Sequence, residues 1–358
     1  MSGFSFSFAG DDIEVDPTQE GPPPVSRHAA ETGSLARRKS SGAFPVPGHP
    51  LLPPAHHALE ELLETLPSQI AYSMLVVALD DGSEMGIPRR ELWDVRAQLM
   101  AEDEGGGEGE GEGLVGLGND DVKTGVYEGG FKSWESSVDL VKVLGGRTSV
   151  GGGRRRVLEL GCGTALPSLA ALQWFLQDTT SSTSAGLELG LADYNPTVLQ
   201  LVTLPNVLLS WAHIIKSESW EVEGELDIDE ALISEFISSL NSRNIRLSFF
   251  SGAWSQDFVS LVTDKMHASC ENTIIIGAET IYSPFALRAF AEALMALLEL
   301  STGPNKTALV GAKKVYFGVG GSMEDFIEHV TAQGALVEQV REESDGVRRA
   351  VIEVKKAG

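Results

Sequence analysis

Short apolar runs alternate with segments of helical periodicity from about residue 130 to the C-terminus. A strand buried on both faces is apolar at nearly every position, so these runs predict strands of a largely parallel sheet. They cover residues 157–160, 187–193, 245–251, 273–278 and 307–311. Apolar residues at helical spacing predict helices over residues 134–144, 167–176, 196–207, 256–266, 284–300 and 323–333.

Two more strand-like runs stand at the end of the chain, at residues 336–341 and 347–354. They flank Asp345-Gly346, a dipeptide typical of tight hairpin turns, and so predict an antiparallel pair. Strands that alternate with helices and end in a hairpin predict an α/β fold, with a doubly wound sheet in which one strand is reversed. We expect this sheet to form a domain over residues 121–358.

The N-terminal part of the chain has a different pattern. Residues 1–50 are rich in Pro, Gly, Ser and Ala and predict a disordered tail. Residues 51–101 predict a small α+β extension, with a helical turn at 58–63, a strand at 72–79 and a helix at 91–100 preceded by Pro88. Residues 102–120 alternate Glu with Gly and predict a flexible acidic loop, and the acidic stretch 218–229 predicts a surface insertion.

The formal net charge of −24 over 358 residues bears on the expected partners. Phosphate backbones would be repelled, so no direct nucleic-acid binding is expected, and a basic protein is the natural complement. Acidic residues that merely keep the chain soluble would explain the charge equally well. No apolar run is predicted to cross a bilayer and no secretory leader is recognised, so no membrane association is expected.

The sequence predicts no metal centre. The two cysteines, Cys162 and Cys270, are far apart and lack metal-ligand spacing, which fits a reducing compartment. None of the seven histidines falls in a motif, and His56-His57 predicts a solvated pair in a loop. Catalysis by a histidine of this chain is therefore not expected.

A glycine-rich turn, ELGCGT at residues 159–164, follows the first predicted strand and leads to Pro167, which opens a helix. Glycines let the backbone approach a ligand closely, and the helix N-terminus faces the same crevice. The spacing is neither that of a dinucleotide site nor that of a P-loop. The turn resembles the cofactor loop of seven-stranded methyltransferases, with Glu159, Gly161, Cys162 and Gly163 as candidate contacts to S-adenosylmethionine. A purely structural turn is the alternative.

The second predicted strand ends on a carboxylate, Asp193, ahead of Asn195-Pro196. An acid at this position can accept hydrogen bonds from both hydroxyls of a ribose. Asn195 and Pro196 are also a good N-cap and first residue of a helix, and both roles can hold together. Upstream of the sheet, Gly129-Gly130 marks a special turn before Trp134, which begins a helix that would lie over the crevice as a lid or as a core anchor.

Six ordered motifs resemble the eukaryotic protein-histidine N-methyltransferase family, and the match runs in order from about residue 89 to the C-terminus. They are YEGG at 127–130 with Trp134-Glu135, LADYN at 191–195, VTLPNV at 202–207, FSGAW at 250–254, ETIY at 279–282 and YFGVGG at 316–321. The segment RRELWD at 89–94 is also similar to the N-terminal segment of that family. Residues 164–167 depart from the family pattern, because a second glycine is expected there.

This resemblance implies a class I, Rossmann-like, seven-stranded methyltransferase sheet with S-adenosylmethionine as the donor. The acceptor it implies is a histidine of a large-subunit ribosomal protein, met in the cytoplasm or the nucleus by an enzyme that we expect to be a monomer. The positions it implies for the cofactor are Ser133, Trp134, Glu135, Ser136, Ser137, Gly161, Ala192, Asp193, Tyr194, Gly252, Ala253, Trp254 and Ala278.

Two residues of the ETIY motif are the candidates for catalysis. Neutral imidazole dominates near pH 7, so an acceptor for one ring N–H would leave the other nitrogen free to attack. Glu279 is the candidate for that acceptor, with a role at the start of the helix near Pro284 as the alternative. Tyr282 could hydrogen-bond or stack on the target ring, and the expected substrate channel is lined by Tyr127, Glu128 and Phe317.

Two other functions remain open from the sequence. A lysine methyltransferase of the same fold would use an acid-x-x-Tyr step equally well. A ribosomal-protein-binding assembly factor without catalysis would use the acidic surface to hold a basic partner. The intact Gly161, Gly163 and Asp193 favour an enzyme with a working cofactor site.

Overall fold

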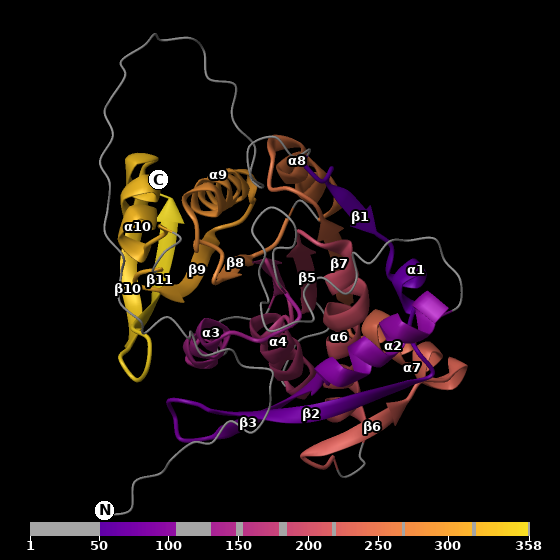
Figure 1. The fold of residues 1–358 in the computed structure, drawn as a ribbon. Coiled ribbons are helices and arrows are strands. Elements are labelled where there is room, and N and C mark those ends of the chain that lie inside the picture. Colours follow the sequence, from indigo (N-terminus) through magenta and orange to yellow (C-terminus); the bar gives the residue numbers. More distant parts are fainter. Residues whose placement is uncertain are drawn as a thin grey trace, which may run out of the picture.

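The computed structural model describes residues 51–104, 130–147, 153–178, 185–216, 220–266, 269–316 and 320–356. The predicted tail lies outside these residues, as does the predicted acidic loop apart from its first residues, which belong to a helix. The described chain forms a mixed sheet with helices on both faces and a second, smaller sheet packed on one helical layer (Figure 1).

The main sheet has the strand order β1-β7-β5-β4-β8-β9-β11-β10. Strands β4, β5, β7, β8 and β9 are parallel, whereas β11 is antiparallel to both of its neighbours, as the hairpin pattern predicted. The bounds are β4 Arg154–Leu160, β5 Gly186–Asp193, β7 Ile245–Ser251, β8 Asn272–Ala278, β9 Asn305–Lys313, β10 Ala335–Glu343 and β11 Arg349–Lys356. All eight residues of β5 are buried, which explains its continuous apolar pattern.

An eighth strand is added at the edge of the expected seven-stranded sheet. β1 (Ala55–His57) pairs antiparallel with the end of β7. Nε2 of His57 lies 2.8 Å from Oγ of Ser251, and the ring of His56 packs against Phe250 at 5.3 Å. The expectation of a solvated loop pair was wrong, because these histidines are half-buried parts of a sheet edge. In the described part of the chain, no group of acidic, histidine or cysteine side chains could hold a metal.

Helices cover both faces of the main sheet. One face carries α3 (Glu135–Gly145), α4 (Leu166–Gln177), α6 (Leu204–Ile215) and α7 (Glu230–Ser242). The other carries α8 (Gln256–Lys265), α9 (Pro284–Leu300) and α10 (Met323–Ala332). α3, α4, α8, α9 and α10 were predicted at nearly these bounds, because the apolar stripe of an amphipathic helix is visible in the sequence. The helix predicted over residues 196–207 covers only the start of α6, and α7 was not predicted.

One long apolar helix lies within the core. α5 (Pro196–Val198) continues through a π-helical turn, η2 (Leu199–Thr203), into α6. Over Pro196–Ile215 its mean hydropathy of 1.6 meets the composition of a membrane span, but 78% of that window is buried inside the protein. The expectation that no apolar run is long enough to cross a bilayer overlooked this helix. Because most of the helix is buried, we assign it to the core of the protein.

The second sheet has the order β3-β2-β6, with β2 Gln69–Ala78, β3 Glu84–Arg90 and β6 Glu223–Asp227. It packs against α3, α4 and α6, and α1 (Leu59–Leu63) and α2 (Leu92–Glu104) complete this part. The stretch read as a surface insertion therefore contains a strand. Pro88 lies inside β3, where an edge strand tolerates a missing N–H donor.

Candidate active site

The glycine-rich turn lies at the carboxyl end of β4, where it meets the segment that leads into α3. Gly161 and Gly163 have φ angles of +69° and +50°. A Cβ atom on Gly163 would lie 3.1 Å from the carbonyl oxygen of Gly130, and one on Gly161 2.9 Å from Cγ2 of Thr280. Two glycines therefore allow a close approach of backbone segments that a side chain would obstruct.

Ala165 takes the conformation that the missing second glycine would favour. Its φ of 60° and ψ of 27° lie in the left-handed region, directly before α4. For a residue with a Cβ this costs on the order of 1 kcal/mol. The residue that departs from the family pattern therefore adds a backbone cost to this turn.

Asp193 stands beside the turn at the end of β5. Its Oδ2 accepts a hydrogen bond from the backbone N–H of Gly163 at 3.0 Å, and its Oδ1 accepts one from the N–H of Asn195 at 3.1 Å. The predicted helix does begin after Asn195, but the Asn195 side chain makes no capping hydrogen bond. The buried carboxylate of Asp193 organises this corner and faces the glycine-rich turn.

The segment before α3 is fastened to the same turn. Oγ of Ser133 lies 2.9 Å from Oγ1 of Thr164 and accepts a hydrogen bond from Arg89 at 3.2 Å. Trp134 occupies the N-cap position of α3, and Nζ of Lys313 lies 5.2 Å from the centre of its ring. Ser133 therefore lies beside the glycine-rich turn. The contact of Ser133 to Ser137 with the cofactor stays a prediction.

The corner after β7 is covered by residues that the sequence did not single out. The carbonyl oxygen of Tyr194 accepts from the N–H of Gly252 at 3.1 Å, and Ala253 donates its N–H to the carbonyl of Leu52 at 2.9 Å. The N–H of Leu52 also reaches the hydroxyl of Tyr194 at 3.4 Å. The segment leading into β1 therefore closes over Tyr194 and Gly252.

Replacing Gly252 by Ala should displace this segment. Gly252 has a φ of +101°, and a Cβ there would lie 2.5 Å from the carbonyl oxygen of Pro53. We expect a loss of about 1–3 kcal/mol of unfolding free energy, together with weaker cofactor binding, measured by thermal melts with and without S-adenosylmethionine. Gly82→Ala, at a positive φ with open space around it, is the matched control for backbone strain alone.

Glu279 follows β8 at the same edge of the sheet and joins three elements. Its φ of 55° is unusual for a residue with a side chain, and its N–H donates to the carbonyl of Gly311 at 2.9 Å. One carboxylate oxygen accepts from the hydroxyl of Ser136 and the other from the hydroxyl of Tyr316. Burial raises the pKa of Glu279, whereas these hydrogen bonds and the charges of Lys313 and Arg349 lower it.

The alternative role of Glu279 at the start of α9 belongs to another residue. Oγ of Ser283 accepts from the N–H of Ala286 at 3.2 Å and so caps that helix. Tyr316, which was quoted within a motif but not chosen as a site residue, is buried against Glu279, and both burial and that carboxylate raise its pKa. Tyr316 is the first residue of the YFGVGG motif, so the sequence did contain a signal that could have identified it as a site residue.

Two predicted cofactor contacts direct their side chains into the protein. Glu159 accepts from the side chain and the backbone N–H of Ser168, and burial raises its pKa to about 8. Sγ of Cys162 lies 3.6 Å from Oγ1 of Thr203, and burial raises the thiol pKa. These side chains hold the turn in shape. Their contact with the cofactor stays a prediction.

The remaining predicted residues fall into two groups. Ala192, Ala253, Trp254, Ala278 and the half-buried Tyr282 lie at or just after the carboxyl ends of β5, β7 and β8, next to the residues above. Tyr127, Glu128 and Phe317 lie outside the described residues.

The strand order, the reversed β11 and a glycine turn with a facing carboxylate define a class I methyltransferase that uses S-adenosylmethionine. No protein-family model matches the chain. It is 36% identical over 255 residues to histidine protein methyltransferase 1 of Saccharomyces cerevisiae, covering 66% of this chain and 67% of the yeast protein. Over 270 residues it is 34% identical to histidine protein methyltransferase 1 of Schizosaccharomyces pombe, covering 75% and 74%. The chain belongs to the histidine protein methyltransferase 1 family.

Solved structures are more distant. Magnesium protoporphyrin IX methyltransferase from Synechocystis PCC 6803 with bound S-adenosylmethionine matches with a TM-score of 0.35 and 8% identity over 62% of this chain and 79% of that chain. Precorrin-6y C5,15-methyltransferase from Geobacter metallireducens matches with a TM-score of 0.32 and 11% identity over 61% and 88%. Values this low carry no argument about activity, so the fold assignment rests on the strand order itself.

Proposed function

We propose that this chain methylates a histidine side chain of a basic protein, namely a protein of the large ribosomal subunit. The observation that carries the proposal is the Glu279 carboxylate, held by Ser136 and Tyr316 at the sheet edge that also bears the glycine turn and Asp193. The names of the relatives support histidine as the acceptor.

The residues present fit S-adenosylmethionine. Gly161 and Gly163 leave no side chain in the way at the turn, and Asp193 offers a carboxylate beside it. When bound, the cofactor supplies a methyl group on a positively charged sulfur, which is electrophilic without further activation. The protein then has to orient the acceptor and exclude water.

Glu279 supplies the orienting acceptor. Each carboxylate oxygen has two lone pairs, so the hydrogen bonds from Ser136 and Tyr316 leave capacity for one ring N–H. Accepting that N–H fixes the tautomer, leaves the second nitrogen free to attack and stabilises the positive charge that develops on the ring. A lysine acceptor would first have to lose a proton, because its unperturbed pKa is about 10.4.

The charge of the chain supports a basic partner. At −24, it would attract a positively charged ribosomal protein and repel nucleic-acid backbone. We propose that the enzyme acts as a monomer in the cytoplasm and nucleus, where a ribosomal protein is met before or during assembly, without membrane association.

Identification of the product tests this function. Purified protein, labelled S-adenosylmethionine and ribosomal proteins from cells lacking the enzyme should yield methylhistidine on one large-subunit protein, located by fragmentation mass spectrometry. Methyllysine would move the function to the lysine-specific alternative. Cofactor binding without transfer to any ribosomal protein would favour the assembly factor.

A further inference from the structure

We propose that Arg349 is a positioning residue for methyl transfer, which holds α3 against Glu279 and, together with Lys313, keeps the Glu279 carboxylate in its anionic, hydrogen-bond-accepting form. This inference rests on the proposed role of Glu279. Arg349 belongs to none of the motifs that mark the site.

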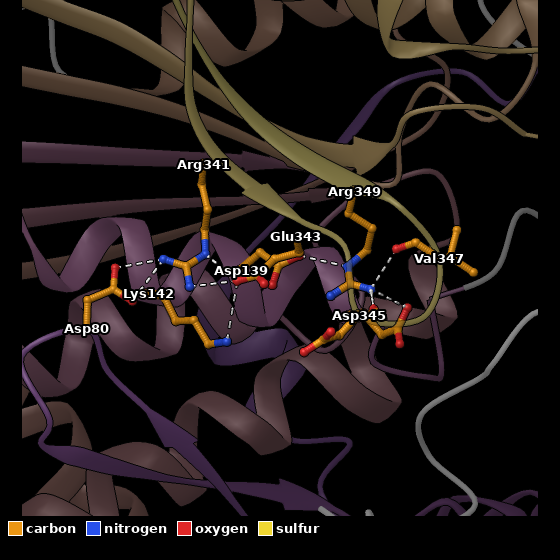
Figure 2. A network of polar contacts seen from close by, with 9 residues as sticks. Asp80, Asp139, Lys142, Arg341, Glu343, Asp345, Val347 and Arg349 are labelled. Atoms are coloured by element: carbon orange, nitrogen blue, oxygen red, sulfur yellow. Dashed lines mark hydrogen bonds and ion pairs between the residues drawn. The ribbon is translucent and has the colours of Figure 1, made fainter.

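The first part of the argument is the contact with α3. Nε of Arg349 donates to Oδ2 of Asp139 at 2.8 Å, and Nη1 donates to Oε2 of Glu135 at 3.1 Å. The side chains of Arg349 and Asp139 are only 9% and 4% exposed. Arg349 thus joins two acidic residues on successive turns of α3, and Ser136 between them is the residue that donates to Glu279. Figure 2 shows Arg349 reaching from the C-terminal hairpin toward Asp139.

The loop of that hairpin also accepts hydrogen bonds from the guanidinium. Nη1 also donates to the carbonyl oxygens of Val347 at 3.1 Å and Asp345 at 3.4 Å. Because a guanidinium presents its donors in a rigid plane, these contacts define its orientation as well as its position. The first residue of β11 is therefore locked between its own turn and α3.

The second part of the argument is electrostatic. Arg349 and Lys313 are direct partners in the β11–β9 register, so their side chains leave the sheet on the same face. Both lower the pKa of Glu279 and oppose the effect of burial. Ser136 on α3 and Tyr316 after β9 donate to this carboxylate. Glu135 and Asp139 on α3 contact Arg349, and Tyr282 after β8 acts on Tyr316.

A second arginine on the hairpin provides a matched control. Arg341 on β10 pairs with Asp80 at 2.7 Å and with Glu343 at 2.6 Å, and Lys142 of α3 lies 3.8 Å from Glu343 (Figure 2). Arg341 therefore also ties the hairpin to its surroundings. Its contacts among the described residues do not include Glu279 or Ser136.

The ionisation of Glu279 can be followed directly in the cofactor-free protein by carboxyl carbon-13 NMR, with the signal assigned by its loss in Glu279→Gln. In Arg349→Gln the titration midpoint should move to higher pH. Removing a nearby positive charge disfavours the anion, and the carboxylate then forms only at higher pH. In Arg349→Lys, which keeps the charge, the midpoint should stay near that of the wild type. In Arg341→Gln it should not move.

The same variants make a kinetic prediction. Activity that requires the Glu279 anion increases as pH rises. The ratio of kcat at pH 6 to kcat at pH 8.5 should therefore be roughly tenfold lower in Arg349→Gln than in the wild type. The rate to compare is kcat at saturating substrate, because the pH dependence of kcat/KM also includes the ionisation of the free substrate histidine. Arg349→Lys should keep the wild-type pH profile, but losing the simultaneous hydrogen bonds to Asp139 and Glu135 should speed amide hydrogen exchange in α3.

An unchanged NMR midpoint and pH profile in Arg349→Gln would overturn the inference. If that variant fails to fold because Asp139 is left buried and unpaired, the double variant Asp139→Asn with Arg349→Gln replaces it. Failure of the proposed function gives a different result. Methylhistidine would then be absent, or Glu279→Gln would be fully active, while Arg349→Gln would still shift the titration midpoint of the Glu279 carboxyl group.

Discussion

Glu279→Gln should lower kcat by about 10²–10³-fold, the range typical of losing one group that stabilises charge in the transition state. The amide presents only one acceptor oxygen, and its NH2 group would face the hydroxyl of Ser136 or Tyr316, both of which donate to Glu279. Glutamine also carries no charge to stabilise an imidazolium ion. Affinity for S-adenosylmethionine should change little, because Asp193 and the glycine turn remain intact.

The measurement is single-turnover transfer of a labelled methyl group, with cofactor affinity by titration calorimetry. Glu342→Gln serves as the control, because Glu342 is ion-paired with Lys314 and Arg348 on the hairpin and does not touch the site. A Glu279→Gln enzyme with kcat within about threefold of the wild type would remove Glu279 from the mechanism, since a group that stabilises transition-state charge contributes about 10²-fold or more.

Asp193→Ala should weaken S-adenosylmethionine binding by about 10²-fold or more. Hydrogen bonds to a charged acceptor contribute about 1.5–3 kcal/mol each, and a factor of ten in affinity is about 1.4 kcal/mol. The substitution also removes the acceptor of the Gly163 and Asn195 N–H groups, so the protein itself should lose some stability.

Calorimetry and thermal melts separate these two effects. Asp193→Asn keeps one side-chain acceptor oxygen, so it should lose less affinity and melt at a higher temperature than Asp193→Ala. Wild-type affinity in a folded Asp193→Ala protein would mean that this carboxylate only shapes the turn. If affinity and melting temperature fall together in Asp193→Ala, the Asp193 carboxylate contributes to the stability of the turn as well as to cofactor binding.

Local periodicity was sufficient to predict most elements of the main sheet and its helical layers. β5 is apolar throughout because both of its faces are covered, and α9 shows its buried stripe directly. The final hairpin was visible from Asp345-Gly346 between two strand patterns. Gly161, Gly163 and Asp193 could be placed at one edge because parallel strands that cross over through helices all end on the same side.

Elements whose stability depends on a distant partner were missed or misread. β1 is three residues long and exists through its pairing with β7, and β6 is an acidic strand that exists through its pairing with β2. β3 contains a proline that argues against a strand until its place at a sheet edge is known. Pairing across more than a hundred residues leaves no periodic trace in either segment.

The sequence by itself determined the fold class, the position of the glycine turn and the acidic end of β5, and it made Glu279 the candidate acceptor, a role that stays a prediction. Only the tertiary structure decided what surrounds Glu279. Ser136 lies 143 residues away in sequence and Tyr316 lies 37 residues away, and Arg349 acts through α3. A motif specifies which groups are available, whereas hydrogen bonding, burial and charge at a site depend on distances that the folded chain alone sets.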